Sequence, residues 1–156
     1  MKPEIVKGNL LAQPVEVIVN AWNRNFLPWW ILLPQGIAGA IKKQGGVQLF
    51  NELRKFGLLS PGEAVLTSAG KLPFRGIIHV AGLNLIWRAT ENSIRLSVRN
   101  AMKVVAENGF TSVAFPIIGA GTGGFKRDTA LNIIVEELNR ITAETRVIIV
   151  IFEKKK

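Results

Sequence analysis

The stretch AFPIIGAGTGGF, residues 114–125, places an apolar strand directly before a glycine-rich turn. Four of the six residues from Gly119 to Gly124 are glycine. Glycine allows positive φ angles and lets the backbone approach a ligand closely. A helical pattern begins soon afterwards at Asp128, and consecutive amides at a helix N-terminus bind anions. The stretch therefore predicts a diphosphate-binding turn, with a plain tight turn as the alternative.

Two known phosphate motifs fit this turn poorly. The segment formally contains GxGxxG, but that dinucleotide fingerprint opens a βαβ unit and is followed by an acidic residue about 20 positions later. Here the turn lies late in the chain, and the next strand ends about thirty positions on at Phe152-Glu153. A P-loop needs lysine directly after the last glycine, and Phe125 stands there instead.

Hydrophobic patterning outward from this turn predicts alternating strands and helices. Apolar, β-branched runs bounded by turn residues indicate strands, and apolar residues at helical spacing indicate helices. We expect strands at residues 4–6, 15–21, 64–68, 77–80, 112–117 and 146–152. We expect helices at residues 37–56, broken at Gly45-Gly46, and at 91–107 and 128–141.

This order predicts an α/β fold in one domain covering residues 1–156. The strands are apolar throughout instead of alternating with polar residues, which indicates a sheet covered on both faces. Helix 91–107 carries an apolar face of Ile94, Val98, Ala101, Met102 and Val105. Leu131, Ile134, Leu138 and Ile141 form the corresponding face of the last helix.

The composition of the chain limits which classes of binding partner are expected. The chain has 156 residues, no cysteine and a net charge of +9. The lack of cysteine favours a cytoplasmic setting, and no apolar run is long enough for a membrane span. The charge predicts either an anionic partner or simply a solvated basic surface. No cluster has metal-ligand spacing, so we expect no metal and no cofactor.

A second polar segment follows the strand at residues 15–21. VIVNAWN carries Asn20 and Asn23 at the carboxyl end of that strand, where open α/β sheets bind ligands. An amide there can donate to and accept from a ribose hydroxyl or a phosphate. A pair of turn-forming asparagines is the alternative.

Taken together, the motifs resemble the macro domain family across nearly the whole chain. The matching segments are KGNL from Lys7, VEVIVNAWN from Val15, QGIAGAI from Gln35, GIIHVAG from Gly76 and AFPIIGAGTGGF from Ala114. GEAVLTSAG from Gly62 belongs to the same series. The resemblance implies a three-layer αβα sandwich around a mixed central sheet, with a cleft that binds ADP-ribose.

The resemblance also implies a role for each matching position. Asn9 and Leu10 would meet adenine, and Phe152 would stack on it. Asn20 and Asn23 would lie near the distal ribose, with Asn23 the one candidate catalytic residue. The diphosphate and distal ribose would lie between two segments, one being Gly36, Ile37 and Ala38, and the other Ile118, Gly119, Ala120, Gly121, Thr122, Gly123, Gly124 and Phe125.

Two departures from the family pattern bear on activity. Asn9 replaces the usual aspartate, so the charge-assisted part of the hydrogen bond to adenine is lost. Ala38 stands where hydrolases of the MacroD type carry an aspartate that helps position or activate water. Asn23 alone cannot replace that carboxylate, because an amide does not titrate usefully. The sequence therefore leaves open whether the protein is an enzyme or a non-catalytic reader.

A third departure is the long segment FLPWWILLPQ, residues 26–35. We expect Trp29 or Trp30 to cover the distal ribose, where Gly123 replaces the aromatic residue common in relatives. Packing in the domain's own core, a dimer contact and membrane dipping are the alternatives. His79, the only histidine, is interpreted as a satisfied core residue behind the site.

Two functions follow. The first is a macro domain that binds ADP-ribose or ADP-ribosylated protein, either as a reader or as a modest hydrolase of ADP-ribosyl linkages, O-acetyl-ADP-ribose or ADP-ribose 1″-phosphate. The second is a non-catalytic module that uses the basic surface to bind nucleic acid or poly(ADP-ribose). A polyanion binder should lose affinity steeply with salt, whereas a single diphosphate ligand should not. No membrane partner is expected, and the oligomeric state is left open.

Overall fold

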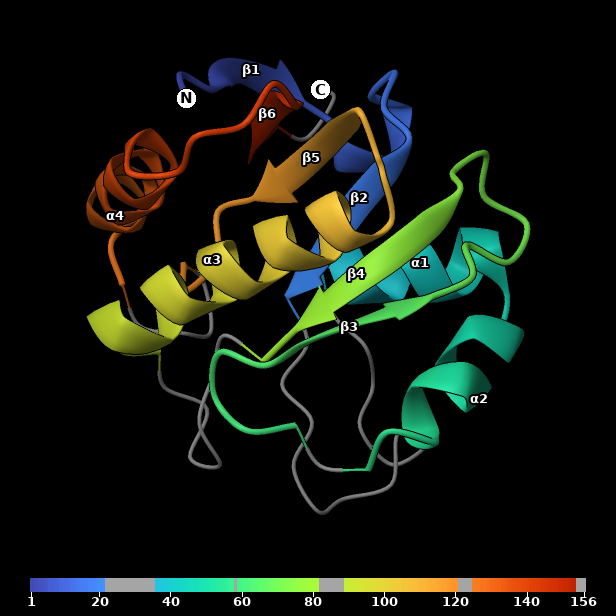
Figure 1. Ribbon diagram of the computed structural model, residues 1–156. Helices are drawn as coiled ribbons and strands as arrows, with labels where there is room; N and C mark the ends of the chain where they lie inside the picture. The colour runs from blue at the N-terminus through green and yellow to red at the C-terminus, as the bar shows by residue number, and fades with distance from the viewer. Residues whose placement is uncertain (22–35, 58, 82–88, 121–124, 154–156) are drawn as a thin grey trace.

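A computed structural model describes residues 1–21, 36–57, 59–81, 89–120 and 125–153. The strands are β1 Glu4–Gly8, β2 Val17–Ala21, β3 Ala64–Thr67, β4 Gly76–Val80, β5 Ser112–Pro116 and β6 Arg146–Phe152. The helices are α1 Gly36–Gly45, α2 Gln48–Arg54, α3 Glu91–Glu107 and α4 Arg127–Asn139, with a 3₁₀ turn, η1, at Leu10–Ala12. Figure 1 shows their arrangement.

The six strands form one mixed sheet in the order β1-β6-β5-β2-β4-β3. Every neighbouring pair is parallel except β3 and β4, which form an antiparallel edge. The expected α/β class with a mixed sheet is thereby confirmed. Since five strands run in one direction, their carboxyl ends lie along the same edge of the sheet.

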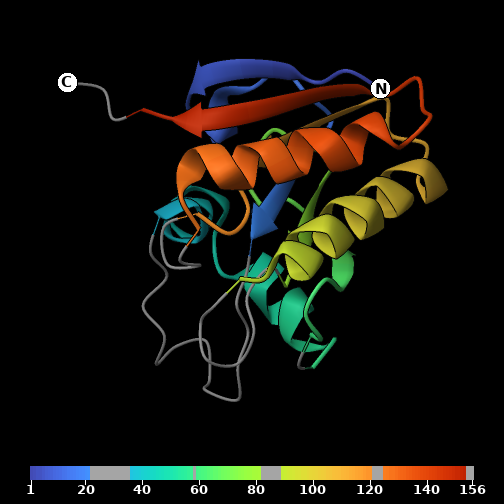
Figure 2. The same cartoon turned by 90° about the vertical axis from the view of Figure 1, so that its left-hand side faces the viewer.

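The sheet is buried on both faces. In β2, Val17 and Val19 belong to one hydrophobic cluster and Ile18 to the other, because successive side chains in a strand point to opposite faces. Helices α3 and α4 pack on the first face, and η1, α1 and α2 supply core residues to the second. Figure 2 shows α3 and α4 side by side over their face. The result is the three-layer αβα sandwich that the resemblance implies.

Helix α3 begins and ends where local chemistry dictates. The Thr90 side chain accepts a hydrogen bond from the Ser93 amide, and the Ser93 hydroxyl accepts one from the Thr90 amide. This reciprocal capping box satisfies two amides that a helix start leaves unpaired. At the other end, Asn108 is followed by Gly109, whose φ of +66° stops the helix. The predicted bounds of 91–107 are confirmed, and the five predicted core residues of the helix are buried.

Other boundaries shift by one or two residues. The strand expected from Val15 begins at Val17, because the Glu16 backbone is bonded elsewhere: its amide donates to Ser112 Oγ and its carbonyl accepts from the Arg75 amide. The strand expected to end at Ile117 ends at Pro116. The last helix spans Arg127–Asn139 instead of 128–141, and Leu131 and Ile141 are only partly buried.

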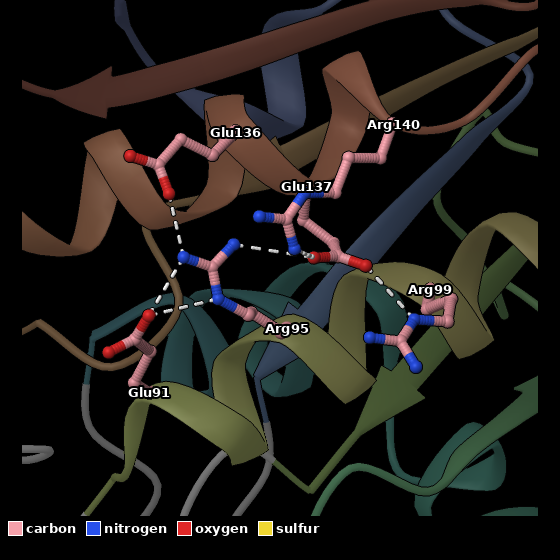
Figure 3. A network of polar contacts seen from close by, with 6 residues as sticks. All are labelled: Glu91, Arg95, Arg99, Glu136, Glu137 and Arg140. Carbon is pink, nitrogen blue, oxygen red and sulfur yellow. Dashed lines mark hydrogen bonds and ion pairs between the residues drawn. The ribbon is translucent and has the colours of Figure 1, made fainter.

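An ionic network joins α3 to α4 (Figure 3). Glu137 of α4 is 3% exposed and accepts contacts from Arg95, Arg99 and Arg140 at 3.3, 2.9 and 3.5 Å. Arg95 also contacts Glu91 at 2.8 Å and Glu136 at 2.6 Å. Hydrogen bonds to Glu136, Glu91 and Glu137 raise the pKa of Arg95 above its ordinary value. The network therefore surrounds one buried carboxylate with guanidinium groups.

Candidate functional site

The carboxyl ends of the parallel strands bring together segments that are far apart in the sequence. Because β5 pairs in parallel with both β2 and β6, the carboxyl ends of these three strands lie side by side. β1 extends the same edge beyond β6. In open α/β sheets this is the edge at which ligands bind.

The β1–β6 end of this edge presents an aromatic ring beside a polar turn. Phe152, the last residue of β6, is paired in register with Gly8 of β1, and its side chain is 58% exposed. Asn9 follows Gly8 directly and is exposed. This end of the edge therefore offers a flat apolar surface next to a carboxamide.

Asn9 and Leu10 have structural partners of their own. Asn9 Oδ1 accepts a hydrogen bond of 3.0 Å from the Leu11 amide and so caps the η1 turn. The Leu10 side chain is only 2% exposed and lies in the core on the η1 face of the sheet. The side chain of Leu10 is therefore not available to a ligand.

The glycine turn leaves β5 in the middle of the edge. Ile118 is fully buried, and Gly119 has a φ of +91°. A Cβ at Gly119 would lie 2.6 Å from Ile94 Cδ1, so both conformation and space favour glycine here. The Phe125 amide donates to the Gly119 carbonyl at 3.2 Å, and Ala120 and Phe125 form an isolated bridge. Both ends of the turn are thus fixed to each other.

Helix α4 starts two residues after the turn. Lys126 is its N-cap and makes no side-chain capping bond, and both Lys126 and Arg127 are exposed. The amides at a helix start carry partial positive charge, to which these two cations add, while Asp128 in the first turn of α4 offsets one of them. The region beside the glycine turn is therefore electrostatically suited to an anion.

Asn20 lies on β2, the strand beside β5, and is fully buried. Its Nδ2 atom is 3.1 Å from Nδ1 of His79, its register partner on β4. His79 Nε2 is 2.8 Å from Thr67 Oγ1, and the Thr67 hydroxyl donates to the Ser68 carbonyl at 2.9 Å. Four residues on three neighbouring strands and the following turn are thus connected by hydrogen bonds.

Burial keeps the imidazole of His79 neutral. Removal from water lowers the pKa of His79 from 6.5 to about 3. The interpretation of His79 as a buried residue with satisfied hydrogen bonds is confirmed. Thr67 was not recognised as part of this region from sequence, because a threonine at a strand end has no distinctive pattern.

Several expected site residues cannot be placed in the same way. Asn23, the Trp29-Trp30 segment and residues 121–124 lie outside the described residues. Gly36, Ile37 and Ala38 form the first turn of α1. Within the described ranges, no group of His, Asp or Glu side chains is arranged to hold a metal ion, and no helix is long and apolar enough to cross a membrane.

The sheet order and the helices on both faces define a mixed-sheet αβα sandwich. Residues 19–134 match the Macro domain family model. The chain is 33% identical over 149 aligned residues to a protein from Enterobacter sp. (strain 638) named O-acetyl-ADP-ribose deacetylase, covering 89% of this chain and 79% of the relative. The chain therefore belongs to the Macro domain family.

Solved structures agree with this assignment. A variant of the Oceanobacillus iheyensis macrodomain solved with ADPR is 29% identical, with a TM-score of 0.80 over 95% of this chain and 83% of that one. The Trypanosoma brucei macrodomain in complex with ADP is 23% identical, with a TM-score of 0.83 over 98% of this chain and 65% of that one. The second likeness concerns the fold alone.

Proposed function

We propose that this protein binds ADP-ribose and its derivatives along the carboxyl edge of its sheet. The observation that carries the proposal is the strand order β1-β6-β5-β2. Along that order lie an exposed aromatic ring beside Asn9, then the glycine turn with the start of α4, then Asn20. Adenosine, diphosphate and distal ribose follow one another in ADP-ribose in the same sequence.

The dimensions of the edge support this assignment. Neighbouring strands lie about 4.8 Å apart, so β1 and β2 are separated by about 14 Å along the edge. A nucleoside diphosphate that carries a second ribose is long enough to extend over several strands. The ADPR named with the Oceanobacillus iheyensis structure supports the same ligand class.

The reaction we propose is the hydrolysis of O-acetyl-ADP-ribose, because a relative carries the name of that deacetylase. Water adds to the ester carbonyl, the ribose oxygen leaves with a proton, and acetate and ADP-ribose are released. Asn23 would place the water together with the substrate's own diphosphate. Since Ala38 provides no carboxylate, we expect slow turnover. ADP-ribosylated protein and ADP-ribose 1″-phosphate are further candidate substrates.

The decisive test incubates the protein with O-acetyl-ADP-ribose and with mono-ADP-ribosylated protein and identifies products by mass spectrometry. We expect acetate release that Asn23→Ala reduces and Ala38→Asp increases. Asn51→Ala, which removes an exposed amide on α2, is the matched control and should leave the rate unchanged. Binding of ADP-ribose without any product would make the protein a reader instead of a hydrolase.

Binding itself is tested at the adenine end. Phe152→Ala should weaken ADP-ribose binding about tenfold in titration calorimetry, because stacking on a base contributes about 1–3 kcal/mol. Phe56→Ala removes a phenylalanine that is similarly exposed, at 49%, just after α2. Equal affinities for the two variants would contradict the placement of adenine.

Asn9→Asp tests the same end in the opposite direction. An aspartate can keep the cap on the Leu11 amide and offers a second, charged oxygen to the adenine amine. We expect tighter ADP-ribose binding in the same titration. An unchanged affinity would count against contact between residue 9 and adenine.

The basic-module function is not proposed, because the deacetylase name of the relative and the ADPR named with the Oceanobacillus iheyensis structure favour a single nucleotide ligand. A steep loss of affinity with increasing salt would reopen it.

A further inference from the structure

The hydrogen bonds from Asn20 to Ser68 can run in only one direction. The Ser68 carbonyl can accept but not donate, so the bond of 2.9 Å commits the Thr67 hydroxyl proton to it. Thr67 Oγ1 must then accept the bond of 2.8 Å from His79 Nε2. His79 Nε2 is therefore the protonated nitrogen of the ring.

This tautomer determines how the Asn20 amide is turned. With the proton on Nε2 and a neutral ring, His79 Nδ1 can only accept a hydrogen bond. Asn20 must therefore direct its NH₂ group to His79, at 3.1 Å. The side-chain oxygen of Asn20 then faces away from the imidazole.

Among the described residues, no donor is within hydrogen-bond distance of that oxygen. In those ranges Asn20 Oδ1 is the one buried side-chain nitrogen or oxygen atom without a hydrogen-bond partner. An unpaired buried acceptor is destabilising, and native proteins rarely retain one. It lies one residue before the end of β2, at the edge where the proposed ligand binds. A donor is therefore missing at a position that the fold keeps in one orientation.

We propose that His79 and Thr67 are positioning residues that set the polarity of Asn20, so that its oxygen accepts a hydrogen bond from a hydroxyl of the ligand's second ribose. The hydroxyl reaches Oδ1 directly or through one water molecule. The inference rests on the proposed function and extends it, since it names the feature that distinguishes ADP-ribose from ADP. Ligands without the second ribose lack the donor.

Thr67 is the place to test this role, because it lies on β3, two strands away from β2. Thr67→Val keeps the shape of the side chain but removes the acceptor for the Nε2 proton. Without this acceptor, the imidazole is no longer held in the tautomer protonated on Nε2. The Asn20 amide can then turn its NH₂ group toward the ligand. Thr67→Ser retains the hydroxyl and is the matched control.

The first measurement is nitrogen NMR of the imidazole in the full chain without a histidine tag. His79 is the only histidine, so its two ring nitrogens are observed without overlap. We expect a protonated Nε2 and an unprotonated Nδ1 in the wild type and in Thr67→Ser, and loss of this pattern in Thr67→Val. A wild-type ring protonated on Nδ1 would overturn the proposal.

The second measurement compares ADP-ribose with ADP in titration calorimetry. Thr67→Val should weaken ADP-ribose binding about tenfold and leave ADP binding unchanged, since only one hydrogen bond is lost. Equal losses for both ligands would show a merely structural role, and no loss would also overturn the proposal. Failure of the wild type to bind ADP-ribose would refute the proposed function as well. Binding that Thr67→Val does not alter refutes the positioning role alone.

Discussion

Two polar networks connect separate elements of this protein, and they differ in charge and in direction. The series of hydrogen bonds from Asn20 through His79 to Thr67 is neutral and buried, and it has one direction, because each proton has one possible position. The α3–α4 network is ionic, and one buried carboxylate, Glu137, is approached by several guanidinium groups (Figure 3).

The difference shows what each network can do. Arg95 is 14% exposed at its side chain, whereas Arg99 and Arg140 are 54% and 65% exposed and can exchange Glu137 for water. Such a network holds two helices together but does not impose one orientation on a single group. The neutral series of hydrogen bonds orients the Asn20 amide, because reversing any one of these bonds would leave two donors or two acceptors facing each other.

The largest expected effect comes from removing the buried carboxylate. Glu137→Ala should lower the free energy of unfolding by about 3 kcal/mol in urea denaturation, because it breaks a buried ion pair from one side. Glu136→Ala removes an exposed partner of Arg95 and should cost much less, because solvent screens exposed ion pairs. Similar losses of stability for the two variants would mean that the burial of Glu137 does not increase its contribution.

The next largest effect is expected when the pH is lowered, because the folded state keeps the imidazole of His79 neutral. The folded state keeps His79 neutral down to about pH 3, whereas the unfolded chain takes up a proton near pH 6.5. The unfolded state therefore binds more protons below pH 6.5, so stability is full above that pH and falls on acidification. Between about pH 8 and about pH 5 the loss should be about 2 kcal/mol.

The control for this prediction is His79→Gln, which cannot titrate and should show a flat profile over the same range. Glu4, Glu16 and Glu136 do not obscure it, because hydrogen bonds lower their pKa below the ordinary value of 4.5. Their stabilising contribution is present above pH 4.5 and is lost as the pH falls through the lowered values. A wild-type profile that stays flat to pH 5 would contradict a neutral buried ring.

A smaller effect should follow from changing the shape of a charge instead of removing it. Arg95→Lys keeps the positive charge but cannot reach Glu91, Glu136 and Glu137 together, since an ammonium group lacks the planar fork. We expect a loss of about 1 kcal/mol in thermal or urea unfolding. Full stability of this variant would show that charge alone matters in the network.

The smallest effect is expected at a fully solvated pair. Lys103 and Glu107 on α3 are 3.9 Å apart and are 73% and 60% exposed. Glu107→Gln should change stability by less than about 0.5 kcal/mol, because water and ions screen such pairs. A larger change would mean that the surface of α3 contributes more than its exposure indicates.

Much of the fold could be predicted from local sequence. The capping box at Thr90 and Ser93 and the stop at Asn108-Gly109 act within a few residues, so the bounds of α3 could be predicted without tertiary information. The bounds of β6 were predicted correctly for a related reason, since its apolar run is uninterrupted. The start of β2 was predicted two residues early, because Glu16 binds partners from β5 and the turn before β4.

The candidate site divides in a similar way. The glycine turn and the asparagine segment are recognisable because their chemistry is local: glycine frees the backbone, and an amide at a strand end faces the ligand edge. The partners of Asn20 were not predictable, because His79 and Thr67 are 59 and 47 positions away in the chain and meet it only through strand pairing.

By itself, then, the sequence determined the elements, the αβα class and the family, since these depend on short-range patterns and on the order of motifs. Only the tertiary structure decided the strand order that places the aromatic end, the glycine turn and Asn20 along one edge. It alone also decided the direction of the hydrogen bonds behind Asn20. The physical reason is that donors and acceptors are matched across strands, and the matching partner is set by sheet register and not by neighbours in the chain.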